Sequence, residues 1–144
     1  MGLMMRAGIA ELVSTRGSEH PADRLDLVRM IRQGLDYDAV ENAAAAAGID
    51  LNELAGYGAI PLRTLSHSRR QGRFSPIQSD RVMRFLRVWS LACDVFGTVD
   101  KARAWMGRST LPLDGRRPAE LLDTDEGARL VEELLGRIEH GIAA

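Results

Sequence analysis

The chain has 144 residues and a formal net charge of −1, with 19 Lys and Arg against 20 Asp and Glu, and 45% of its residues are hydrophobic. These values fit one compact domain or two small helical lobes, and they argue against a disordered chain or a uniformly basic one. The single cysteine, Cys93, excludes an internal disulfide, and no apolar run approaches the roughly 18 residues that a membrane helix needs. We therefore expect a cytoplasmic protein that needs no cofactor and does not contact a membrane.

Charged residues are unevenly distributed along the chain. Residues 61–87 contain seven arginines and a single acidic residue, Asp80. From Asp114 onward the balance is reversed, with eight acidic residues against four arginines. Such asymmetry predicts two surfaces that meet different partners.

The chain is expected to begin with a flexible segment followed by two helices. Residues 14–23 combine Gly, Pro, Ser and charge without apolar periodicity, which is typical of a flexible lead-in. An apolar stripe of helical period begins near Arg24 and ends at Gly34. Asp36 can then cap a second, alanine-rich helix that runs to Ala47.

Two short helices around a glycine-containing turn come next. Asp50 and Glu53 have the spacing of a capping box, in which each side chain accepts a backbone N–H of the other residue. Pro61 suits the first position of the following helix, where a missing N–H costs nothing. Leu62 and Leu65 are expected to face back toward the earlier helix. Short helices joined by such a turn predict a helix-turn-helix.

The longest helix is predicted to begin after Ser75. Ser75 can cap it, Pro76 suits its first position and Gln78 would complete a capping box. The apolar residues of this helix form one stripe that ends at Gly97. They are Val82, Phe85, Leu86, Trp89, Cys93 and Phe96. We expect Trp89 and Cys93 to serve as core residues rather than as ligand-binding or reactive groups.

The remaining sequence predicts two more helices separated by a loop. Thr98 can cap a helix that contains Trp105, another expected core residue, and stops at Gly107. Residues 107–117 are rich in turn formers. Asp123 and Glu126 then have cap spacing before a final helix with one apolar face, formed by Val131, Leu134, Leu135 and Ile138.

The fold class that follows is all-α, because no stretch alternates apolar and polar residues over the length of a strand. We divide the chain into a flexible segment (1–23), a helix-turn-helix DNA-binding region (24–74) and a helical C-terminal domain (75–144). Catalysis is not expected, since the sequence has no nucleophile, metalloprotease or P-loop motif. The three histidines, His20, His67 and His140, are also too far apart for a metal pair.

DNA binding is predicted for the helix expected at residues 61–70 and its basic flank. Its outward face would bring polar side chains to base edges, with Arg63 suited to guanine, while other residues would contact phosphates. The predicted contact residues are Arg63, Thr64, Ser66, His67, Arg69, Arg70 and Arg73. A solvated arginine face is the alternative. A homodimer is expected with DNA binding, because one helix reads only a few base pairs.

The second half of the sequence resembles a known family. The opening of the long helix at residues 79–81 (SDR), the segments 92–97 (ACDVFG), 102–105 (ARAW) and 118–124 (PAELLDT), and the ending 137–141 (RIEHG) occur in the order found in antitoxins of RES–Xre toxin–antitoxin pairs, which are similar to ParS and MbcA. The resemblance implies a type II antitoxin. Such a protein has an Xre/Cro-like helix-turn-helix that represses its own operon and a small helical toxin-binding domain.

The resemblance also implies a partner and a set of contacts. The partner would be a cognate RES-domain toxin that degrades NAD, and the antitoxin would occlude its active-site cleft without any catalysis of its own. Carried onto this chain, the implied toxin contacts are Leu113, Arg137, His140, Gly141 and Ile142. The chain departs from the family at Leu113-Asp114-Gly115, where a Leu-Gly-Gly turn is expected.

Other interpretations are compatible with the same residues. The chain could be a stand-alone Xre-like repressor with an unrelated oligomerising or sensing domain, and a neighbouring reading frame for a RES toxin would count against that. It could be an interaction module that has lost DNA binding, which salt-dependent operator binding would exclude. An undetected hydrolase would show turnover by the pure protein.

Overall fold

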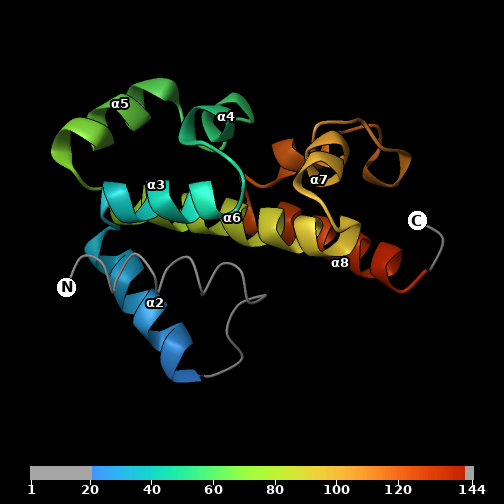
Figure 1. Ribbon diagram of the computed structural model, residues 1–144, viewed down its shortest axis with the longest axis horizontal. Coiled ribbons are helices and arrows are strands. Elements are labelled where there is room, and N and C mark those ends of the chain that lie inside the picture. The colour runs from blue at the N-terminus through green and yellow to red at the C-terminus, as the bar shows by residue number, and fades with distance from the viewer. Residues whose placement is uncertain (1–20, 142–144) are drawn as a thin grey trace.

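The structure, a computed structural model, describes residues 21–141, and every regular element in that range is a helix (Figure 1). The α-helices are α2 (Pro21–Gln33), α3 (Tyr37–Ala46), α4 (Leu51–Gly56), α5 (Leu62–Gln71), α6 (Pro76–Phe96), α7 (Val99–Met106) and α8 (Asp125–Glu139), and two 3-10 turns are η1 (Leu111–Leu113) and η2 (Pro118–Leu121). The all-α prediction is confirmed. Most of the predicted flexible segment lies outside the described residues, and α2 begins three residues earlier than expected.

Helices α3 and α4 form where their caps predict. Asp36 accepts a hydrogen bond from the Ala39 amide at 3.2 Å, and Asp50 accepts one from the Glu53 amide at 2.7 Å. The small residues of α3 let it pack closely, so that one of its faces is fully buried. The Glu53 side chain does not complete the expected capping box, because its carboxylate pairs with Arg103 of α7.

Helix α5 begins one residue later than predicted and faces the core differently. Pro61 is its N-cap rather than its first helical residue. Leu65 packs into the core with 4% of its surface exposed, as predicted, whereas Leu62 is 62% exposed. The expectation that both leucines face inward was therefore wrong. The inward face of α5 is instead made by Leu65 and Ser68.

Helix α6 runs along the centre of the molecule, and α2, α7 and α8 pack against it (Figure 1). It begins at the Ser75 cap as predicted, although the Gln78 side-chain oxygen lies buried without a partner among the described residues, so the expected box is only half formed. Its apolar stripe is confirmed and is wider than predicted. Trp89 is fully buried, and Cys93 is half-buried against the core.

The C-terminal elements pack on the far half of α6. Thr98 caps α7 as predicted. The loop after α7 is pinned by an antiparallel bridge between Thr110 and Arg116, with η1 between them. The predicted cap of α8 was one residue out: Thr124, not Asp123, accepts the hydrogen bond from the Gly127 amide at 3.0 Å.

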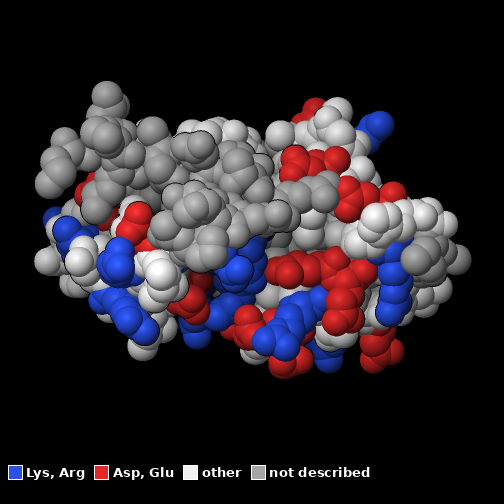
Figure 2. Space-filling view, turned by 90° about the horizontal axis from the view of Figure 1, so that it is seen from below, with Lys and Arg blue, Asp and Glu red and all other residues white. Residues whose placement is uncertain are grey.

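Charge is separated between the two ends of the molecule. Helix α5 contains three arginines and no acidic residue. Helix α8 contains five acidic residues and two arginines. Figure 2 shows the molecule from below, with Asp and Glu side chains gathered over the half that lies toward the C-terminal end. The two predicted surfaces therefore differ in sign as well as in position.

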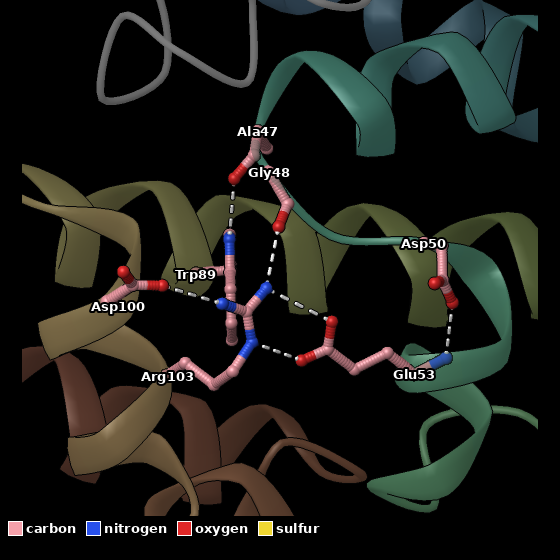
Figure 3. A network of polar contacts seen from close by, with 7 residues as sticks. All are labelled: Ala47, Gly48, Asp50, Glu53, Trp89, Asp100 and Arg103. Carbon is pink, nitrogen blue, oxygen red and sulfur yellow. Dashed lines mark hydrogen bonds and ion pairs between the residues drawn. The ribbon is translucent and has the colours of Figure 1, made fainter.

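A polar network beside Trp89 joins the turn between α3 and α4 to helix α7 (Figure 3). Arg103 of α7 makes two hydrogen bonds to the Glu53 carboxylate, at 2.7 and 3.3 Å, and donates to the Gly48 carbonyl at 2.9 Å. Its guanidinium lies 5.6 Å from the centre of the Trp89 ring, and the Trp89 indole N–H donates to the Ala47 carbonyl at 2.8 Å. Such fixed contacts hold the turn between α3 and α4 against α7.

Candidate functional site

The outward face of α5 presents four of the predicted DNA-contacting residues to solvent. Arg63, Ser66, His67 and Arg70 are all exposed, and they lie on the side of the helix opposite Leu65 and Ser68. Residues three and four positions apart on a helix are neighbours on its surface. The four side chains therefore form one polar strip, with an arginine near each end.

The other three predicted residues have contacts within the fold. Thr64 is half-buried. Arg69 is exposed, but its Nε donates to the Tyr37 hydroxyl at 3.3 Å. Arg73 donates to the Gly34 carbonyl at 2.6 Å. Arg69 and Arg73 thus link the end of α5 to α3 and to the end of α2, and they lie beside the exposed strip rather than within it.

Sequence reasoning missed one exposed residue on α5. Leu62 was assigned to the core from its spacing to Leu65, but it lies on the flank of the polar strip, next to Arg63 and one turn before Ser66. The spacing alone could not have shown this, because positions 62, 65 and 68 lie within an arc of about 120° on one face of the helix.

The implied toxin contacts lie at the other end of the molecule. Arg137, His140 and Gly141 are exposed around the end of α8. Ile142 lies outside the described residues. Leu113 is 7% exposed and packs against the core, whereas its neighbour Leu111 is 91% exposed. The contact of Leu113 with a toxin stays a prediction.

A small recess lies between η1 and α8, lined by Pro112, Leu113, Leu130, Glu133, Leu134 and Arg137. Leu130, which lines the recess, is 52% exposed. Leu111, which precedes Pro112 in the chain, is also exposed. Sequence reasoning also missed Leu130, although its place one residue before the buried Val131 marks it as an apolar residue off the packed face. The exposed Leu130, Glu133 and Arg137 thus line one recess.

Nothing in the described residues assembles a reactive centre. No group of three or more His, Cys, Asp and Glu side chains there could hold a metal ion. Burial raises the pKa of the Cys93 thiol, and the nearby Asp94 adds to the effect, which disfavours the thiolate needed for nucleophilic chemistry. None of the described helices combines the length and apolar character needed to cross a membrane.

A second cavity, of about 390 Å³, lies against the turn between α3 and α4. Arg69 and Arg103 line it together with Glu41, Asp50 and Glu53. Arg103 and Glu53 are paired with each other, and Asp50 caps α4. Arg103, Glu53 and Asp50 therefore stabilise the turn between α3 and α4 and its packing on α7.

Comparison with known proteins covers nearly all of the described chain. Residues 26–87 match the family model of the antitoxin Xre-like helix-turn-helix domain, and residues 91–141 match that of the antitoxin Xre/MbcA/ParS C-terminal toxin-binding domain. A protein of Yersinia enterocolitica named Antitoxin Xre is 40% identical over 119 residues, which cover 81% of this chain and 80% of the relative.

Two further relatives carry the same name. Antitoxin Xre of Photorhabdus laumondii is 39% identical over 111 residues, covering 74% of this chain and 72% of the relative. Antitoxin Xre of Pseudomonas putida is 36% identical over 83 residues, covering 57% and 52%. With a helix-turn-helix domain before a toxin-binding domain in one all-helical fold, the chain belongs to the Xre family of antitoxins.

Proposed function

We propose that this chain is the antitoxin of a type II pair whose toxin is a RES-domain enzyme that degrades NAD. It neutralises the toxin by covering the active-site cleft, and it represses its own operon by binding operator DNA as a homodimer. The observation that carries the proposal is the separation of an exposed arginine strip on α5 from α8, an acidic helix that bears the exposed Leu130. One molecule can thereby meet two unlike partners.

The DNA-binding part of the proposal rests on α5. Its exposed strip is basic, and the major groove of DNA is wide enough to admit an α-helix. Arg63 and Arg70 are suited to guanine, and Ser66 and His67 to polar base edges or phosphates. Arg69 and Arg73 are held by Tyr37 and Gly34 at positions from which they can also reach the DNA backbone.

The toxin-binding part of the proposal rests on the end of α8 and the recess beside η1. Arg137, His140 and Gly141 form an exposed tip. Leu111 and Leu130 would supply the apolar contacts that a stable interface needs at its centre. The acidic surface of α8 is complementary to a cleft that binds an anionic dinucleotide. Blocking such a cleft requires no chemistry from the antitoxin, and we infer that the chain is not an enzyme and acts in the cytoplasm.

The proposal is tested by co-expressing the chain with the product of the adjacent reading frame. Growth, cellular NAD and co-purification are scored together. Rescue of growth and of NAD, with a stable complex, is the expected result. If the neighbouring product is not toxic, or forms no complex, the stand-alone repressor becomes the better interpretation of the arginine strip.

Two sets of variants separate the surfaces. Replacing Arg63 and Arg70 by Ala should abolish operator binding and leave neutralisation intact, because the strip lies far from the α8 tip. Replacing Arg24 and Arg29, two exposed arginines on α2, by Ala is the matched control and should change neither activity. Loss of both activities in the α5 variant would mean that the strip is structural.

The second set concerns the toxin surface. Replacing Leu111 and Leu130 by Asp should release the toxin while operator binding survives, since both side chains are already exposed and the fold tolerates the change. Deletion of residues 140–144 should have the same effect and keeps Ile138 in place against the core. An unchanged neutralisation titre in both variants would show that the toxin binds elsewhere.

A further inference from the structure

Leu62 is an exposed apolar residue at the start of a basic helix. Leu62 is the first residue of α5 and is 62% exposed, whereas Leu65, one turn later, is 4% exposed. The packing of the chain on itself therefore makes little use of Leu62. Because burial of a leucine side chain is favourable, its exposure here leaves that free energy available to a partner.

The position of Leu62 on α5 indicates which partner. Recognition helices contact base edges with the residues near their N-terminal ends. Leu62 is adjacent in sequence to Arg63 and four residues before Ser66, so it lies along the flank of the exposed polar strip. Helix α5 has three arginines and no acidic residue, so the electrostatic attraction of the strip is toward nucleic acid.

Resting on the DNA binding proposed above, we propose that Leu62 recognises the 5-methyl group of thymine in the major groove. A leucine cannot donate or accept a hydrogen bond, and placing it against a phosphate would only remove water from a charged group. The thymine methyl is the apolar group that a base pair presents in the major groove. Leu62 would thus determine sequence at a base step next to the one that Arg63 contacts.

The size of the effect follows from the area of one methyl group. Burying a methyl is worth about 0.8 kcal/mol, which corresponds to about a fourfold change in affinity for each contacted thymine. A methyl preference of this size is measurable in equilibrium binding at constant salt, and salt must be held constant because the arginine contacts depend on it.

The test removes the methyl from the DNA and the leucine from the protein in turn. The full-length protein first selects its preferred site from random duplexes, and each thymine of that duplex is then replaced by deoxyuridine, which lacks only the methyl. We expect one or two replacements per half-site to weaken binding of the unaltered protein about fourfold. The same replacements should have no effect on Leu62→Ala, which itself binds the unmodified duplex about sixteenfold less tightly, because the homodimer loses the contact at both half-sites. Leu25→Ala, an exposed leucine on α2, is the matched control and should retain the full methyl preference.

The outcomes distinguish this inference from the proposal on which it rests. If no duplex is selected, the proposed DNA binding fails and the inference fails with it. If a duplex is selected but every deoxyuridine replacement is neutral, or Leu62→Ala keeps the methyl preference, the inference alone is overturned. It is also overturned if sedimentation shows that Leu62→Ala dissociates a dimer, because Leu62 would then belong to a protein–protein contact.

Discussion

Replacement of Gly48 by alanine should strongly destabilise the protein because Gly48, in the turn between α3 and α4, packs directly against Val99 of α7. Its φ is +82°, a left-handed conformation that costs a residue with a side chain about 1–2 kcal/mol. An added Cβ would also lie 2.8 and 2.9 Å from the two γ-carbons of Val99. Because both branches of the valine are too close and its χ1 is stiff, no simple rotation removes the overlap.

The expected magnitude combines these two contributions. Overpacking of this kind costs about 1–3 kcal/mol, so Gly48→Ala should lower the free energy of unfolding by about 2–5 kcal/mol. For a chain of this size, that corresponds to a fall in Tm of about 6–15 °C. Thermal unfolding followed by circular dichroism, with urea titration for the free energies, measures both quantities.

A second variant and a control isolate the contact. Val99→Ala removes the overlapping carbons, so the double variant should be about 1–3 kcal/mol more stable than the sum of the two single effects predicts. Gly58→Ala is the control, because Gly58 has a φ of +85° but no atom within 4 Å of the added Cβ. Gly58→Ala should lower the free energy of unfolding only by the cost of the left-handed backbone, about 1–2 kcal/mol. Val99→Ala should not restore that loss. A coupling near zero between positions 48 and 99 would refute the close packing of this turn on α7.

Three further predictions concern the C-terminal half. Thr124→Ala should lower the free energy of unfolding by about 1 kcal/mol through loss of the α8 cap, whereas Asp123→Ala should change it by less than about 0.5 kcal/mol in urea titrations; the reverse order would place the cap at Asp123. Asp114→Gly should raise stability by about 0.5–1 kcal/mol, since Asp114 has a φ of 58°, and a loss of stability in the same assay would contradict this account of the turn. Because burial and Asp94 raise the pKa of the Cys93 thiol, its alkylation by iodoacetamide at pH 8, followed by mass spectrometry, should be severalfold slower in the folded protein than in urea, and equal rates would be inconsistent with a half-buried thiol.

Much of the fold could be predicted from the sequence because its boundaries are set by short-range interactions. The caps at Asp36, Ser75 and Thr98 each accept an amide three residues ahead, and the left-handed Gly97 ends α6 where the apolar stripe ends. These interactions join residues close in sequence and need no knowledge of the rest of the chain. The same holds for the exposed arginines of α5, once Leu65 defines its inner face.

The errors arose where a distant residue decides the outcome. Glu53 has the spacing of a capping box, but the charged Arg103, 50 residues away, offers a bidentate interaction that is stronger than one bond to a backbone N–H. Whether Leu62 or Leu113 is buried depends on which element covers it, and spacing alone does not contain that information. At position 114 the resemblance predicts glycine and this chain has aspartate, which adopts the left-handed conformation.

The continuity of α6 limits how parts of this chain can be exchanged with those of its relatives. The two family matches end and begin at residues 87 and 91, so the boundary between them falls inside a single helix about 30 Å long. On that helix, Phe85 stacks on Trp89, and Trp89 also contacts both the α3–α4 turn and Arg103 of α7. A chimera joined at that boundary would place side chains from two different proteins in this one packed layer, and their shapes would not match. An exchange of the toxin-binding domain with that of a relative should therefore carry α6 and the turn after α3 together.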